Sequence, residues 1–156
     1  KAFSSEQKAA AWARTQELAS SPDEAVRRSA LKNIAGASDK RADAATILAK
    51  LLSEKDTTGT GAPPLQREFA LKSLGDLPFS KDTAKLAPLA LSAIRSGPAA
   101  PGAVAFLSKA DDIGPELVKM LDGSDPVSAG NALLVLGAMK TFPKKAMPAT
   151  DSILLS

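Results

Sequence analysis

Apolar residues recur along most of this chain at the three- and four-residue spacing that places them on one face of a helix. The fullest stripe consists of Ala44, Ile47, Leu48, Leu51 and Leu52. A second complete stripe consists of Leu86, Leu89, Ala90, Ala93 and Ile94. Followed along all 156 residues, the same spacing predicts about eight helices.

Turn-forming residues indicate where the second of these helices begins and ends. Ser21 is followed by Pro22 and, three residues after the serine, by Glu24. A serine N-cap, a proline at the first helical position and a glutamate at the third form a capping box. The sequence therefore predicts a helix that begins near Pro22 with Ser21 as its N-cap. We expect Gly36 to end this helix in a left-handed conformation.

Two other helix starts can be predicted in the same way. Ser4 and Gln7 have the spacing of a capping box and predict the start of the first helix. Asp111 and Asp112 precede Pro115, and aspartate is a favoured N-cap. Neighbouring residues point in different directions, so a catalytic pair of carboxylates is the less favoured interpretation. We expect the two aspartates to cap the helix that begins at Pro115.

An apolar helix, a polar turn and a second apolar helix follow one another four times along the chain. The approximate repeats are residues 8–36, 43–75, 84–110 and 113–140. One hairpin leaves a face of each helix uncovered, so at least three hairpins must stack to bury a continuous core. The pattern predicts a single all-α helical-repeat domain over residues 1–156, with a compact non-repeating helical bundle as the alternative.

The composition agrees with helices and narrows the chemistry. The chain has 30 Ala and 20 Leu, both strong helix formers. It has no Cys, His or Tyr, which excludes disulfides, thiolate or imidazole metal sites and any nucleophile paired with His. The net charge of +3 comes from evenly spread residues, whereas a nucleic-acid surface normally shows clustered basic residues. We predict no catalytic residue, no cofactor and no metal site.

The second helices of the hairpins resemble those of the HEAT-repeat, or armadillo-like, family, in which Asp, Val-Arg, Ala and Leu-Gly recur. The best copy consists of Asp23, Val26, Arg27, Ala30, Ile34 and Gly36. The second unit keeps Arg67, Ala70, Leu74 and Gly75, and the fourth keeps Asp125, Pro126, Ala132, Leu136 and Gly137. The resemblance implies a right-handed α-solenoid, an ARM-type superhelix of about four hairpins. It also implies a structural ladder between neighbouring repeats, formed by Asp23, Arg27, Arg67 and Asp125.

The same resemblance places the second helices along a concave surface. The exposed residues expected there are Arg28, Lys32, Glu68 and Lys72. Their mixed charge indicates the polar surface of a protein as the partner, so we expect a non-catalytic protein-protein interaction or scaffold module. An anion site formed by Arg27, Arg28 and Lys32 is the alternative for the first of these helices.

The last predicted helix has no charged residue between Pro126 and Met139. Its apolar residues occupy more than one face, so we expect it to be covered on both sides. Either the segment that follows folds back as a cap, or the chain is part of a larger protein. Asn131 lies within this helix, and a buried amide must find hydrogen-bond partners, so we expect it to join neighbouring helices.

Three further functions stay open as alternatives. The first is a spacer or assembly domain of a large exported bacterial protein, resembling HEAT stretches that link other domains. The second is a HEAT-like nucleic-acid-binding or repair protein, which the single Trp disfavours. The third is an accessory enzyme role like that of HEAT-like bilin lyases. No apolar run reaches the roughly 20 residues that span a bilayer, and exported, periplasmic and cytoplasmic locations are all possible.

Overall fold

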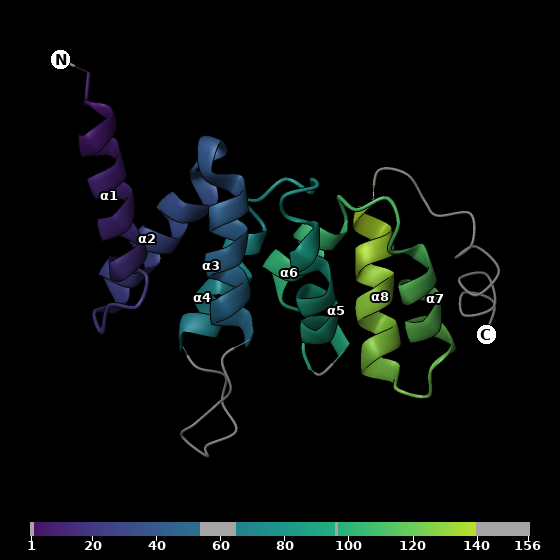
Figure 1. The fold of residues 1–156 in the computed structure, drawn as a ribbon. Coiled ribbons are helices and arrows are strands. Elements are labelled where there is room, and N and C mark those ends of the chain that lie inside the picture. The colour runs from purple at the N-terminus through teal and green to yellow at the C-terminus, as the bar shows by residue number, and fades with distance from the viewer. Residues whose placement is uncertain (1, 54–64, 96, 140–156) are drawn as a thin grey trace.

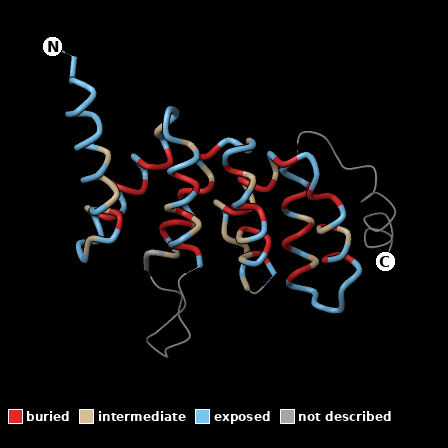
Figure 2. Tube along the Cα trace, in the orientation of Figure 1, coloured by how far each residue is buried: buried red, intermediate tan, exposed pale blue. Residues whose placement is uncertain are grey.

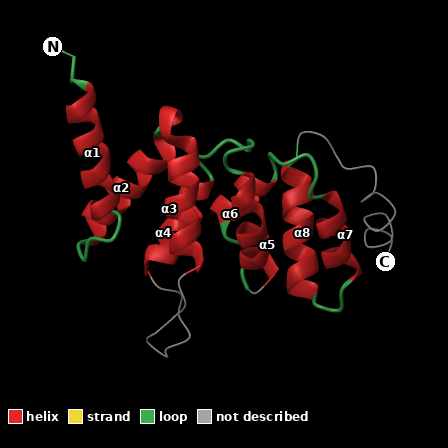
Figure 3. Ribbon diagram, viewed as in Figure 1, coloured by secondary structure: helices red, strands yellow, loops and turns green. Residues whose placement is uncertain are grey.

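The protein is all-helical in the part of the chain that its structure describes. A computed structural model describes residues 2–53, 65–95 and 97–139, with the backbone alone for residues 65 and 66. Within these ranges there are α-helices and two short 3-10 helices, η1 and η2, but no strand (Figure 3). In chain order the elements are α1 (Ser5–Leu18), α2 (Glu24–Gly36), η1 (Ser38–Lys40), α3 (Arg41–Ser53), α4 (Leu65–Leu74), η2 (Ala84–Leu86), α5 (Ala87–Arg95), α6 (Pro101–Leu107), α7 (Gly114–Asp122) and α8 (Pro126–Ala138).

The helices follow one another along the molecule, from α1 at one end to α7 and α8 at the other (Figure 1). Consecutive helices pack as the pairs α1 with α2, α3 with α4, α5 with α6, and α7 with α8. The even-numbered helices also pack on one another in sequence, α2 on α4, α4 on α6, and α6 on α8. Each predicted repeat range overlaps one of the four consecutive pairs.

The core lies between the paired helices (Figure 2). Alanines make up much of the core, and several of them are at most 4% exposed, among them Ala30, Ala70, Ala90, Ala103 and Ala132. In the predicted stripe of α3, Leu48 is fully buried and Ile47 is partly buried against the core. By contrast, α1 has no buried residue and packs through partly buried side chains such as Trp12. The apolar pattern therefore identified the core faces of the inner helices correctly.

The start of the first helix is confirmed, and that of the second differs from the prediction. Ser4 and Gln7 form the expected reciprocal capping box of α1. The second helix begins at Glu24, and its N-cap is Asp23, whose carboxylate accepts the Val26 N–H at 3.1 Å. The predicted cap, Ser21, instead accepts the Asp23 N–H. Two capping residues lie two positions apart here, and the one nearer the helix caps it.

Two further predictions about helix ends are wrong. Gly36 is the last residue of α2 and does not adopt a left-handed conformation, and the chain continues through an extended Ala37. Asp111 and Asp112 do not cap α7, because Ile113 occupies the N-cap position and no side chain accepts a hydrogen bond there. Pro115 lies in the first turn of α7, where its missing N–H needs no partner.

The last helix packs on three neighbouring helices and keeps one exposed side. Among the residues that the structure describes, α8 packs on α5, α6 and α7. Val127 and Leu134 remain 50% and 55% exposed, so the cover expected on the second side does not come from the described helices and stays a prediction. The segment after residue 139, expected either to fold back as a cap or to continue into a larger protein, lies outside the described residues.

Candidate functional site

Three of the four residues expected to contact a partner lie near one aromatic ring at the contact of α2 with α4. Phe69 of α4 is only 4% exposed. The guanidinium of Arg28, on α2, lies 5.2 Å from the centre of its ring, and the ammonium of Lys72, on α4, lies 5.5 Å from it. A cation within about 6 Å of a ring is attracted by the negative face of the aromatic system. Phe69 therefore holds two surface cations at the junction of the two helices.

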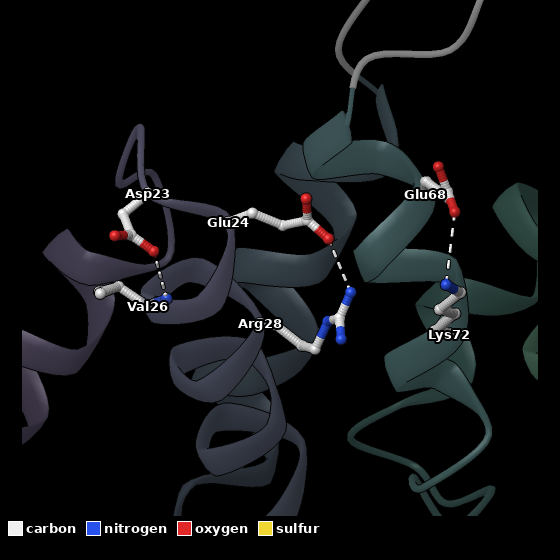
Figure 4. A network of polar contacts seen from close by, with 6 residues as sticks. All are labelled: Asp23, Glu24, Val26, Arg28, Glu68 and Lys72. Atoms are coloured by element: carbon white, nitrogen blue, oxygen red, sulfur yellow. Dashed lines mark hydrogen bonds and ion pairs between the residues drawn. The ribbon is translucent and has the colours of Figure 1, made fainter.

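Each of these cations is also paired with a carboxylate one helical turn earlier (Figure 4). Glu24 accepts a hydrogen bond from Arg28 at 2.7 Å, and Glu68 lies 3.4 Å from the Lys72 ammonium. All four side chains are more than half exposed. Both glutamates lie in the first turn of their helix, where negative charge is favoured by the helix dipole. The result is an exposed surface of alternating charge, which we call the α2–α4 surface: Glu24, Arg28, Glu68 and Lys72 around Phe69.

Of the four residues predicted for a partner surface, three belong to this cluster and one lies beside it. Arg28, Glu68 and Lys72 are brought together as described. Lys32 is exposed on α2, one turn beyond Arg28. It therefore extends the surface along α2 without contacting the ring.

Arg27 has a structural position that differs from the predicted ladder. It is 3% exposed, its Nη1 donates a hydrogen bond to the Ser21 carbonyl oxygen, and its guanidinium lies 5.4 Å from the centre of the Phe69 ring. The described residues show no ion pair between Arg27 or Arg67 and the two aspartates expected to join the ladder. Asp23 and Asp125 act as N-caps of α2 and α8. Because Arg27 is buried, it is not available for an exposed anion site with Arg28 and Lys32.

Two members of the α2–α4 surface, Glu24 and Phe69, were not predicted from the sequence. Glu24 could have been found, because a glutamate four residues before an arginine on a helix is a favourable pair. Phe69 could not, because its contact with Arg28 depends on how α2 packs on α4.

A second polar cluster lies at the other end of the molecule, where Glu116 of α7 bridges two cations. Its carboxylate lies 3.3 Å from the Lys119 ammonium and 3.0 Å from the Arg95 guanidinium of α5. The hydrogen bond and charge of Lys119, followed by those of Arg95, hold the pKa of Glu116 below its usual value. This cluster joins α5 to α7 at the surface.

A cleft of about 690 Å³ lies between α1 and η1. Its walls include Phe3, Trp12 and the alanines at 9–11, with Lys8 and Asp39 at its polar side. The indole Nε1 of Trp12 is buried and has no hydrogen-bond partner. The charged partner residues predicted from the sequence lie elsewhere.

The described residues contain no group of three or more acidic side chains placed to hold a metal ion. None of the described helices has the length and apolar character needed to cross a bilayer. No family model, curated protein or solved structure matches the chain.

Proposed function

We propose that this chain is a non-catalytic protein-interaction module, a HEAT-like α-solenoid of about four hairpins. The α2–α4 surface is its contact site. The row of packed helices α2, α4, α6 and α8 supports the architecture, because stacked second helices create an extended surface. The partner is a folded protein with both acidic and basic residues on its surface.

The single observation that carries the proposal is the arrangement of paired charges over Phe69. Exposed ion pairs contribute only about 0–1 kcal/mol each to stability, so exchanging them for contacts with a partner costs the fold little. Attraction to the buried ring favours these positions of Arg28 and Lys72 in the free chain. Arginine is also enriched where protein interfaces gain most of their affinity.

The proposal can be tested by reversing the two cations that contact the ring. The variant Arg28→Glu with Lys72→Glu removes both cations from the surface but leaves the core unchanged. A matched control, Lys50→Glu with Lys81→Glu, makes the same change in net charge at exposed positions outside the surface. Proteins bound by the wild-type chain in extracts of its own cells should be retained by the control and lost from the test variant. Circular dichroism establishes that both variants fold.

A third variant, Lys32→Glu, measures how far the surface extends along α2. A photo-crosslinking residue at position 32 should capture the same protein, whereas one at position 50 should not. If the charge-reversed variant binds every recovered protein as tightly as the control does, the α2–α4 surface is not the contact site.

A further inference from the structure

The exposed face of α8 has large and small residues at alternating positions. Val127 and Leu134 are exposed on it, seven residues apart. Gly130 lies between them along the helix, and Gly137 lies three residues after Leu134. All four residues share one side of the helix, since steps of three and four residues stay on one helix face. The face carries no charge, because Pro126–Ala138 has no charged residue.

Nothing within the described part of the chain accounts for these two glycines. A Cβ atom added to either would meet no heavy atom within 4 Å, and neither adopts a left-handed conformation. Glycine is less favourable in a helix interior than every residue except proline. On a helix surface, a glycine allows another backbone or a bulky side chain to approach closely.

We propose that α8 pairs with α8 of a second copy of this chain, antiparallel and across a two-fold axis. In an antiparallel pair of identical helices, the residue numbers of two positions that face each other always add up to the same value. With the axis at the level of residue 132, Leu134 faces Gly130 of the copy, and Val127 faces Gly137. Each large residue then meets a glycine, so the face is complementary to itself, as a two-fold interface requires.

A parallel pair lacks this fit, because leucine would face leucine and glycine would face glycine. Charge also favours a second copy. Each chain carries a net charge of +3, and an uncharged contact face lets two copies meet without opposing like charges. A strongly charged partner would find no counter-charge on this face.

The expected interaction is weak and reversible. A helix of 13 residues is about 20 Å long, and at a width of about 10 Å its face covers far less than the roughly 800 Å² per partner of a standard interface. Analytical ultracentrifugation of the 156-residue chain from about 10 μM to about 1 mM should therefore show a shift from monomer to dimer with increasing concentration.

Exchanging the large and small residues gives a specific test of the register. Gly130→Leu alone places leucine against Leu134 of the copy and should shift the dissociation constant at least tenfold toward monomer. Adding Leu134→Gly restores a large-to-small match and should recover dimerisation. Ala13→Leu, which adds an exposed leucine to α1, is the control and should leave dimerisation unchanged.

Cysteine crosslinking gives a second measurement that uses single substitutions. The chain has no cysteine of its own. When equal amounts of Gly130→Cys and Leu134→Cys proteins are mixed and oxidised, the heterodimer should exceed the half of all dimers that random pairing would give. A wild-type chain that stays monomeric throughout the concentration range overturns the proposal, as does a heterodimer share no larger than random pairing gives. If the introduced thiol of a monomeric Leu134→Cys protein resists alkylation, the chain covers its own α8, and this too would overturn the proposal.

Discussion

Gly102 crosses the end of α4 so closely that a Cβ atom on it would overlap the carbonyl oxygen of Leu71. The same added atom would lie 2.9 Å from the carbonyl oxygen of Lys72. Both obstacles are backbone atoms, which cannot move aside as a flexible side chain can. The contact between α4 and α6 therefore depends on glycine at position 102.

The variant Gly102→Ala should destabilise the protein by about 1–3 kcal/mol, because overpacking forces the two helices apart. Thermal unfolding followed by circular dichroism measures the loss. Gly36→Ala is the matched control, because an added Cβ there meets no atom within 4 Å. It should be neutral or stabilise by up to about 1 kcal/mol. Equal melting temperatures for the two variants would contradict the close crossing of α4 and α6.

Asn131 joins α8 to the end of α5. Its side-chain amide donates hydrogen bonds to the carbonyl oxygens of Ile94 at 2.7 Å and of Gly97 at 2.8 Å. Asn131→Ala leaves these carbonyls without a partner and should cost about 1–3 kcal/mol in the free energy of unfolding. Urea denaturation measures this cost, and Asn33→Ala, at an exposed position of α2, should change it by much less. A loss at position 131 no larger than at position 33 would show that water replaces the amide freely.

Asp125 caps α8 by accepting hydrogen bonds from the N–H groups of Val127 and Ser128, both at 3.1 Å. Asp125→Ala should therefore destabilise the protein by about 1 kcal/mol. Asp112→Ala tests the corrected position before α7 and should have little effect, because no side chain caps that helix. Chemical denaturation of both variants compares them directly. A larger loss of stability in Asp112→Ala than in Asp125→Ala would contradict this assignment of the helix caps.

Local features of this fold could be predicted from the sequence, whereas contacts between helices could not. The stripe that includes Leu48 identified a core face because helical periodicity depends only on neighbouring residues. Asn131 was expected to join helices, since an amide in an apolar helix needs partners, but its partner carbonyls at Ile94 and Gly97 were not foreseen. Phe69 and Gly102 were missed because their importance arises from the crossings of α4 with α2 and α6.

In the candidate site, too, single residues could be predicted from the sequence, whereas the contacts between helices could not. The exposed cations Arg28 and Lys72 could be selected because both lie on predicted second helices away from the apolar stripe. That they share one aromatic ring follows only from the packing of the two helices. The family resemblance implied a ladder in which Arg27 joins the turn aspartates of neighbouring repeats. Instead, Arg27 donates a hydrogen bond to the turn at Ser21 on its own hairpin and contacts the next hairpin through the Phe69 ring. The spacing of residues along the sequence does not show which of several nearby polar groups a side chain will bind.

Glu116 should titrate below the ordinary glutamate pKa of 4.5, because the hydrogen bond and charge of Lys119, followed by those of Arg95, favour its ionised form. A carboxyl group with a lower pKa in the folded state stabilises the fold above its unfolded pKa. This contribution is lost as the pH falls from about 4.5 through the lowered pKa. The effect on stability is small, since the side chain is exposed and screened by solvent. NMR titration of the Glu116 carboxyl carbon measures the shift. In the variant Lys119→Ala the pKa should rise toward 4.5, and in Lys32→Ala, which removes a distant cation, it should stay where it is. An unchanged pKa in Lys119→Ala would mean that Arg95 alone holds the carboxylate.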